Sequence, residues 1–537
     1  MQGPISRTFH LLAVLLLCAA MAAQAEGPTK ETSAWWGHIK VLASDDFQGR
    51  LTGSPGYQKA AAYVADSFHR FGLMPAGQDG YLQAVAYDVQ TVLPDRSQVS
   101  LIRPQGTEHL NLGDDLVLWA SRMQRSTVTG PLIFVGYGIH MPEAGYDDFE
   151  SLPVKGAIIV CIVGGPQVLT GPQRAHAFAE NLPHYLEEAG ALGAITIIPT
   201  KNLGLPWSRV KATSVQPGML LEEVALRPYK KATFAALFNE KAADKLFAGT
   251  GHTYSELAAL ADANKPLPRF PLKASLDAKI AVERSQATAG NVIARLPGSD
   301  PDLSKEAIVL SAHLDHLGTG APDHGDGIYH GAMDDASGVA SLLEVARAMH
   351  DAAYRPRRSI LFLAVSGEEK GLLGSRYFAA HPTWHAGPIV ADLNTDMFLP
   401  LFPLTRLVGF GAEESSLGDD ARAIGKALGV ELVPDPAPDH LIFVRADQYS
   451  FVRKGIPALM LAFSPRPGTP EVQAFADFWS QRYHAQADDL NQPVDLAAAE
   501  AFDAFLLRLS MQLADAPTRP VWHRTSFFAR FAQAPLP

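Results

Sequence analysis

The chain of 537 residues is poor in cysteine, has no surplus of basic residues and lacks long apolar runs beyond its first segment. Its 2 cysteines exclude a small scaffold held together by disulfides. Lys and Arg number 45 against 56 Asp and Glu, and the net charge of -11 argues against a nucleic-acid binder, which needs a basic surface to neutralise phosphates. No later stretch offers the ~18 consecutive apolar residues of a transmembrane helix. A hydrophobic content of 47% and a charged content of 19% are ordinary for a globular protein of several domains.

The first 25 residues have the pattern of a secretory signal peptide. Arg7 provides a positive start, residues 11–20 form a short apolar run, and Ala-Gln-Ala at 23–25 is a typical cleavage site. Cleavage after Ala25 would remove Cys18 and leave Cys161 as the lone cysteine, in an apolar run where a buried strand thiol is expected. We therefore expect an exported protein, periplasmic or secreted, with no membrane span after cleavage.

The middle of the chain predicts a mostly β insert. Short, β-branched runs at 131–138, 156–163 and 194–199 are separated by turns, and 185–192 has a helical pattern. The predicted domains are the signal peptide at 1–25, a discontinuous domain formed by 26–120 and 275–515, the insert at 121–274 and a tail at 516–537. The tail carries no recognisable motif.

Both halves of the discontinuous domain contain core elements. Apolar residues at helical spacing predict a helix over 57–71 and another over 338–350. Largely apolar strands are predicted at 291–296, 307–312, 359–365, 389–394, 407–410 and 458–462. Their alternation with helices predicts an α/β fold whose mixed, mainly parallel central sheet is flanked by helices. Active sites in such sheets lie at the carboxyl ends of strands.

Polar clusters stand at those strand ends and before one helix. They contain His313 and Asp315, Asp334 and Asp335, Glu368 and Glu369, Asp396, and Tyr483 with His484. Each one alone has an ordinary structural interpretation: an Asp capping a helix, a solvated Glu pair or a surface His. Together they would concentrate negative charge in one cleft, and cations would be needed to neutralise it. Histidines mixed with carboxylates suit zinc or a similar divalent ion.

This order of motifs resembles the co-catalytic dizinc exopeptidases, a family typified by bacterial secreted leucyl aminopeptidases. The matching motifs are His-x-Asp at 313–315, Asp-Asp-x-Ser-Gly at 334–338, Glu-Glu at 368–369, Asn-x-Asp-Met at 394–397 and Tyr-His at 483–484. The resemblance extends to the Gly-rich segment 49–56. The insert is similar to a protease-associated domain, through Gly-Tyr-Gly at 136–138 and Tyr-Asp-Asp-Phe at 146–149. The resemblance implies a zinc exopeptidase fold with an inserted protease-associated domain.

The resemblance also implies a set of metal ligands. His313 and Asp396 would hold one ion, Glu369 and His484 would hold the other, and Asp334 would bridge them. The cofactor would be two zinc ions per chain, or another divalent metal. In this family a cis peptide often follows the bridging residue, here between Asp334 and Asp335.

Three further residues receive catalytic roles from the resemblance. Glu368 would be the general base, Asp315 would accept a hydrogen bond from the His313 imidazole, and Tyr483 would donate to the oxyanion. His316 is additional to the motif and receives no ligand role. Gln448 stands where relatives often carry His, so its loop either shapes the substrate pocket or is structural.

The expected function is a zinc aminopeptidase acting on peptide substrates. A carboxypeptidase of the same fold is the alternative, and it would need a basic residue aimed at the terminal carboxylate. A non-catalytic binding or receptor-like homologue is a third possibility, opposed by the complete ligand set. Glutaminyl cyclase is disfavoured because the five ligands indicate two metals. The sequence indicates neither the preferred N-terminal residue nor the oligomeric state.

Overall fold

The computed structural model describes residues 28–120, 122–322 and 325–532. The predicted signal peptide lies outside these ranges and stays a prediction. Within them, none of the helices combines the length and the apolar character needed to cross a bilayer.

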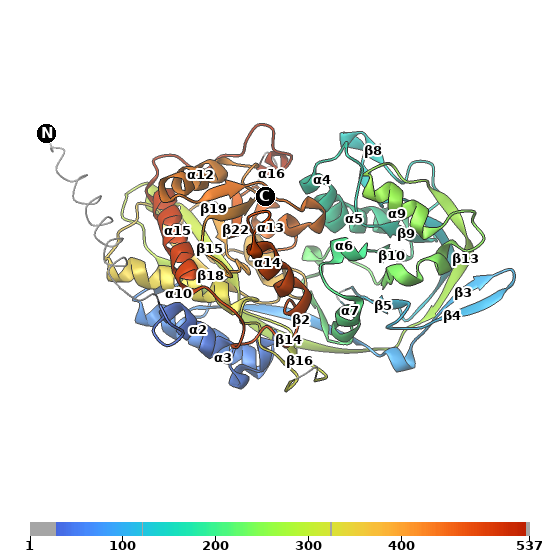
Figure 1. Cartoon of the computed structure of the whole chain (residues 1–537), viewed down its shortest axis with the longest axis horizontal. Coiled ribbons are helices and arrows are strands. Elements are labelled where there is room, and N and C mark those ends of the chain that lie inside the picture. Colours follow the sequence, from blue (N-terminus) through green and yellow to red (C-terminus); the bar gives the residue numbers. More distant parts are fainter. Residues whose placement is uncertain (1–27, 121, 323–324, 533–537) are drawn as a thin grey trace.

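The larger of two main sheets has ten strands (Figure 1). Its order is β11 (Gly218–Leu221), β2 (Leu82–Val92), β14 (Val282–Leu296), β18 (Ser359–Val365), β15 (Ala307–His313), β19 (Ile389–Asn394), β22 (Ala458–Phe463), β20 (Arg406–Phe410) and β21 (Glu431–Val433), with β1 (Met74–Pro75) beside β14. The central strands β18, β15, β19 and β22 are parallel. Antiparallel pairs join β2 to β14, β14 to β18, and β22 to β20. The predicted α/β class with a mixed sheet is confirmed, and its parallel part is the centre.

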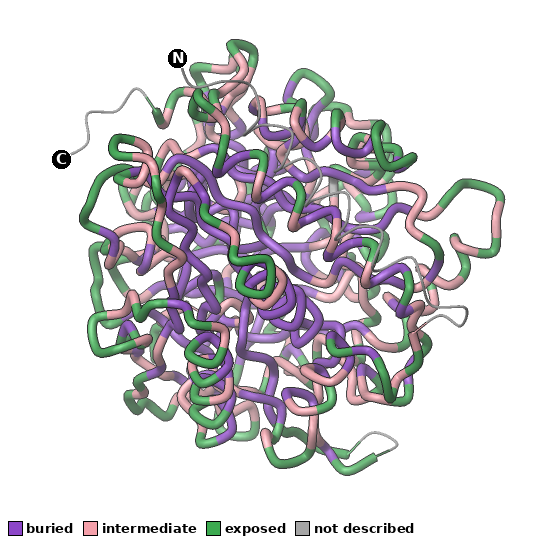
Figure 2. The backbone as a smooth tube through the Cα atoms, turned by 90° about the vertical axis from the view of Figure 1, so that its left-hand side faces the viewer, coloured by how far each residue is buried: buried purple, intermediate pink, exposed green. Residues whose placement is uncertain are grey.

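Helices cover both faces of this sheet, which is why its central strands are largely apolar. Every residue of β15 is buried, and alternate residues enter different cores: Ile308 and Leu310 join one cluster, whereas Val309 joins another. The first cluster includes residues of α2 (Ala34–Leu42), α3 (Pro55–Arg70), α10 (Ala336–Asp351) and α15 (Leu496–Asp515). The second includes residues of α11 (Leu373–Ala380) and α13 (Gln448–Val452). Figure 2 shows buried stretches running through the middle of the molecule with exposed loops around them.

The second sheet has eight strands and lies beside the first (Figure 1). Its order is β4 (Gly106–Leu110), β3 (Gln98–Arg103), β13 (Phe270–Lys279), β6 (Thr127–Phe134), β9 (Ile158–Ile162), β10 (Gly193–Ile197), β12 (Phe234–Phe238) and β5 (Leu116–Leu118). The three strand-like runs of the predicted insert lie over β6, β9 and β10, and its helical run overlaps α5 (Leu182–Ala189). Burial raises the pKa of the Cys161 thiol in β9 to about 12, so this cysteine is a core residue.

The second sheet extends beyond both predicted boundaries of the insert. Strands β3, β4 and β5 precede residue 121, and β13 ends at Lys279. Conversely, β11 lies within 121–274 but pairs with β2 in the larger sheet. The division into domains and the protease-associated assignment stay predictions.

The tail packs against residues from two distant parts of the chain. Phe528 is fully buried, and its ring lies 5.2 Å from that of Phe443 and 6.1 Å from His176, the last residue of α4 (Gly171–His176). The Trp522 indole N–H donates to the Gly455 carbonyl at 2.9 Å. The tail therefore contacts residues of both the range 275–515 and the predicted insert at 121–274.

Candidate metal centre

Three neighbouring parallel strands deliver the central residues of the cluster. His313 is the last residue of β15, Glu368 and Glu369 follow β18, and Asp396 follows β19. Because β15 pairs in parallel with both β18 and β19, these residues emerge at one edge of the sheet. The strand pattern alone therefore explains how three of the five predicted ligands meet.

Loops provide Asp334 and His484. The peptide bond between Asp334 and Asp335 is cis, as the resemblance implies. The Asp335 carboxylate caps α10 by accepting from the Gly338 N–H at 2.9 Å, and it accepts from the Met397 N–H at 3.2 Å. Asp335 thus joins the start of α10 to the loop that carries Asp396.

Asp488 joins the two loops that carry Asp334 and His484. Its buried carboxylate accepts from the backbone N–H of Asp334 at 3.0 Å and from that of Met333 at 2.9 Å. Because Asp488 lies four residues after His484, these bonds bring His484 to the cluster. No motif in the sequence distinguishes Asp488.

The five predicted ligands form two groups that share Asp334. His313 Nε2 lies 3.1 Å from Asp334 Oδ1 and 3.5 Å from Asp396 Oδ1. His484 Nε2 lies 3.2 Å from Asp334 Oδ2 and 3.2 Å from Glu369 Oε2. Ligand atoms at ~2.0–2.2 Å from a tetrahedral zinc ion are about 3.3 Å apart, so both groups have the spacing of zinc ligands. The two oxygens of Asp334 face different histidines, as a bridging carboxylate requires.

The cluster brings several buried carboxylates together, and they shift the pKa values of their neighbours. Removal from water raises the pKa of the Glu368 carboxyl well above its ordinary value, and Asp396 and Glu369 contribute to the increase. Burial lowers the pKa of His484, but the carboxylates of Glu369 and Asp334 more than reverse this effect and bring that pKa to about 10. The negative potential that raises the pKa values of Glu368 and His484 also attracts divalent cations.

Unpartnered polar atoms provide a test of whether this residue set fits a metal. Among the described residues, Asp334 Oδ2, Glu369 Oε1 and His316 Nδ1 are buried without a hydrogen-bond partner. Each such atom costs free energy unless something other than a hydrogen bond satisfies it. Carboxylate oxygens and imidazole nitrogens together are the ligands of zinc-type ions, so the residues fit the implied cofactor.

Asp315 contacts the cluster through both its backbone and its side chain. His313 Nδ1 lies 3.0 Å from the backbone carbonyl oxygen of Asp315, which orients the imidazole. The Asp315 carboxylate instead accepts from the Thr52 hydroxyl at 2.9 Å and from the Glu368 N–H at 3.1 Å. Asp315 thus contacts the His313 imidazole through its backbone oxygen, while its carboxylate holds the Glu368 backbone. Thr52 lies in the Gly-rich segment 49–56, which was the one available signal for it.

Arg50 holds together two chain segments that carry predicted ligands. Its guanidinium is fully buried and donates to the carbonyls of Leu314 at 2.9 Å, His330 at 2.7 Å and Gly331 at 3.0 Å. Burial lowers its pKa to about 10, so it stays charged at neutral pH. Arg50 thereby ties the chain after His313 to the loop that leads into Asp334.

Tyr483 contacts both His484 and Arg445. The Tyr483 ring stacks on His484 with centroids 4.0 Å apart, and the exposed Arg445 guanidinium donates to the Tyr483 hydroxyl at 3.4 Å. Nearby, Gln448 is buried, accepts from the Asn394 amide at 2.9 Å and donates to the Phe443 carbonyl at 3.0 Å. These bonds favour the structural interpretation of the Gln448 loop over a role in the pocket.

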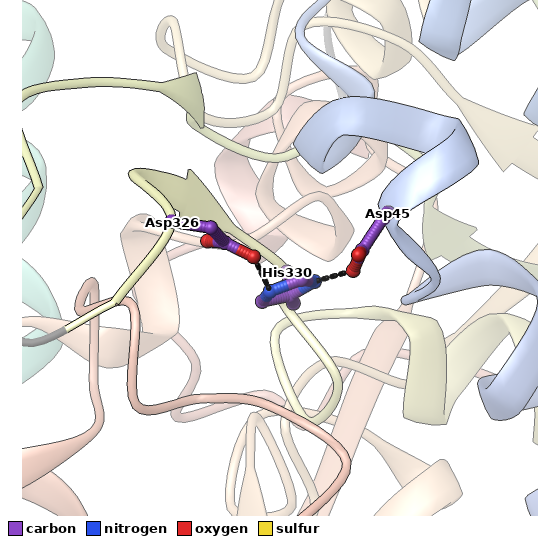
Figure 3. A group of neighbouring side chains, drawn as sticks. All are labelled: Asp45, Asp326 and His330. Carbon is purple, nitrogen blue, oxygen red and sulfur yellow. Dashed lines mark ion pairs between the residues drawn. The ribbon is translucent and has the colours of Figure 1, made fainter.

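A second group with metal-ligand chemistry lies at the surface (Figure 3). There Asp45 and Asp326 flank His330, with closest nitrogen–oxygen distances of 3.9 and 3.5 Å. The Asp45 side chain is 81% exposed, and His330 Nδ1 is 3.0 Å from the Ala43 carbonyl oxygen. We interpret this group as solvated ion pairs.

Two curated proteins are similar to parts of this chain. The chain is 40% identical over 107 residues to a probable zinc metalloprotease of Pyrenophora teres f. teres, and 28% identical over 189 residues to a probable leucine aminopeptidase 2 of Aspergillus oryzae. These matches cover 20% and 34% of this chain, and 22% and 35% of the relatives. The chain thus matches only about a quarter to a third of the length of these curated relatives.

A solved structure shares the fold over nearly the whole chain. It is the aminopeptidase from Aneurinibacillus sp. strain AM-1, which aligns with 91% of this chain and 95% of its own at a TM-score of 0.52 and 18% identity. At that identity the likeness is evidence for the fold.

The family model of peptidase family M28 matches residues 291–510. This range contains both groups of predicted ligands, Glu368 and Tyr483. Over this segment, the chain is similar to peptidase family M28.

Proposed function

We propose that this protein is a zinc-dependent aminopeptidase that removes N-terminal residues from peptides, using two metal ions and Glu368 as general base. One observation carries the proposal: the two oxygens of Asp334 face His313 and His484 separately, at 3.1 and 3.2 Å. A carboxylate so placed can join two cation positions, which is the arrangement of two-metal hydrolases.

Glu368 is suited to proton transfer because it belongs to neither ligand group among the described residues. Its backbone N–H is held by the Asp315 carboxylate, and its own carboxyl lies in the field of Asp396. Bound divalent ions would make a water easier to deprotonate and would polarise the scissile carbonyl. Glu368 would accept a proton from the attacking water and pass it to the leaving amine.

The surroundings of the site favour an N-terminal substrate. The Glu368 and Asp396 carboxylates would attract the ammonium group of a peptide. The Tyr483 ring stacks on His484, and its hydroxyl would donate to the oxyanion that forms during the reaction. The aminopeptidase names of the Aspergillus relative and the Aneurinibacillus structure agree with this orientation.

Arg445 favours a carboxypeptidase as the second candidate. Its exposed guanidinium, 3.4 Å from the Tyr483 hydroxyl, is a cation near the site that could pair with a terminal carboxylate. The same arginine is compatible with an aminopeptidase that prefers short peptides. The C-terminal carboxylate of such a peptide would reach Arg445.

The base assignment is tested with Glu368→Gln, which keeps the side-chain shape and removes the basic carboxylate. We expect turnover of aminoacyl amides to fall by about 10²–10⁴-fold while the zinc content stays at that of the wild type. Elemental analysis measures the metal, and steady-state kinetics measure turnover. Glu283→Gln, at an exposed position of β14, is the matched control and should behave as the wild type. Wild-type turnover in Glu368→Gln would refute the assignment.

The direction of trimming is tested by mass spectrometry of a mixed peptide library after digestion, with and without a chelator. Loss of N-terminal residues that the chelator abolishes supports the proposal. Loss of C-terminal residues would establish the second candidate instead. An unchanged library would indicate a binding protein.

A further inference from the structure

His316 lies inside the second ligand group although the motif assigns it no role. Its side chain is fully buried, and with Asp334 and Glu369 it forms a group whose potential ligand atoms lie within 4.8 Å of one another. The chain holds it there through its backbone, since the His316 N–H donates to the Arg50 carbonyl at 3.3 Å. The ring also meets that of His484 edge-on, with centroids 6.1 Å apart.

His316 Nδ1 lies next to carboxylate oxygens of both other residues in the group. Nδ1 is 2.7 Å from Glu369 Oε1 and 3.8 Å from Asp334 Oδ2. The shorter separation is a hydrogen-bond length, yet among the described residues both Nδ1 and Oε1 lack a hydrogen bond of acceptable angle. Three buried atoms from three residues, none of them with a hydrogen bond among the described residues, therefore lie close together and beside His484 Nε2.

We propose that His316 is a further ligand, through Nδ1, of the metal ion held by Asp334, Glu369 and His484. This inference rests on the proposed two-metal function and adds a residue to one of its two sites. The ion it would take is zinc or another divalent metal that accepts imidazole and carboxylate together.

The added ligand makes the two metal positions unequal. The position near His313 has three protein ligands, from His313, Asp334 and Asp396, whereas the other has four, from His316, Asp334, Glu369 and His484. Zinc sites with four protein ligands are typically structural, and those with three keep a place for water or substrate. The ion near His316 is therefore the more firmly held, and the ion near His313 is the one open to substrate.

The test measures zinc binding by the full chain, without relying on activity. Metal-free protein is titrated with Zn²⁺ in the wild type, His316→Leu, His316→Gln and the control His330→Gln. We expect the dissociation constant of one of two ions to rise by more than about 100-fold in both His316 variants, with that of the other ion changing less than about 3-fold. Removing a residue that only orients a ligand costs about 10- to 100-fold. A rise within or below that range overturns the ligand assignment, and His330→Gln should bind as the wild type does.

Failure of this inference is distinguishable from failure of the proposed function. If the wild type binds no zinc, the two-metal proposal itself fails. If the wild type binds two ions and the His316 variants bind both as tightly, only the inference about His316 fails.

X-ray absorption of the fully loaded wild type makes the test independent of whether the variants fold. Its multiple-scattering signal counts imidazoles around zinc. Three imidazoles shared by two ions support His316 as a ligand, and two overturn it.

Discussion

The Tyr483 side chain is held by two neighbours with different chemistry. Its ring stacks on the imidazole of His484, and its hydroxyl accepts from the Arg445 guanidinium. Burial raises the pKa of this phenol above its ordinary value, so the hydroxyl keeps its proton throughout the range in which peptidases work. A permanently protonated donor beside the cluster is suited to stabilising negative charge on a substrate oxygen.

Replacing Tyr483 with Phe tests the hydroxyl apart from the ring. Tyr483→Phe keeps the stacking and should lower kcat by about 10²–10³-fold with zinc content unchanged, the usual effect of losing one oxyanion donor. Kinetics on aminoacyl amides and elemental analysis provide the measurement. Tyr63→Phe, which removes a hydroxyl bonded to His38 at 2.7 Å, is the control and should leave kcat unaltered. An unchanged kcat in Tyr483→Phe would mean that the tyrosine only packs.

The sequence predicts a site residue that belongs to a local motif. It does not predict one whose role depends on contacts with distant parts of the chain. His313, Asp334 and Glu369 stand in recognisable local patterns, and the structure brings them together. Thr52 and Asp488 hold the cluster through bonds to chain segments far away in sequence, which no local pattern encodes.

Helix α10 begins inside the site, and its first turn is tightly packed. A Cβ added at Gly338 would lie 2.5 Å from the Asp335 Oδ2 and 2.5 Å from the Thr395 carbonyl oxygen. Both atoms are fixed, because Asp335 caps the helix and Thr395 immediately precedes Asp396. The absence of a side chain at 338 therefore lets the helix start approach the end of β19.

A methyl group at Gly338 should disturb both stability and metal binding. We expect Gly338→Ala to lower the free energy of unfolding by about 1–3 kcal/mol, as overpacking does, and to weaken zinc binding because Asp335 and Asp396 must shift. Gly37→Ala is a matched control within helix α2, because the described structure has nothing within 4 Å of its added Cβ. It should gain up to about 1 kcal/mol from helix propensity. Chemical denaturation of both variants compares them, and equal stabilities would contradict the packing argument.

Among the elements, the larger sheet was predictable and the edge of the second was not. Strands β15, β18 and β19 are wholly or almost wholly buried, so their apolar runs stand out in the sequence. In the pair of β3 and β4, by contrast, most of β4 is exposed, so it has no apolar run to mark it. That difference explains why the sequence did not predict β4.

The tail is part of the fold of the whole molecule. Phe528 is 0% exposed and lies against Phe443, Tyr449 and His176, residues that come from both sides of the junction. We expect Phe528→Ala to lower the free energy of unfolding by about 3–5 kcal/mol, the usual cost of deleting a buried phenyl group.

A second tail substitution provides the comparison for that prediction. Val521 is 60% exposed, so Val521→Ala should change the stability by less than about 0.5 kcal/mol. Denaturation curves of the full chain measure both. If the two variants are equally stable, the tail does not hold the junction.

The distribution of the cluster along the chain has a consequence for when the protein becomes active. Its residues run from His313 to His484 and meet only after β15, β18, β19, α10 and the loop after α14 (Pro470–Gln481) are all in place. Metal ions that bind such a site favour the completed fold alone, so their binding energy adds to its stability. An unfinished chain lacks the assembled centre and cannot cut its neighbours. Under the proposed function, the activity therefore arises only once the chain has folded.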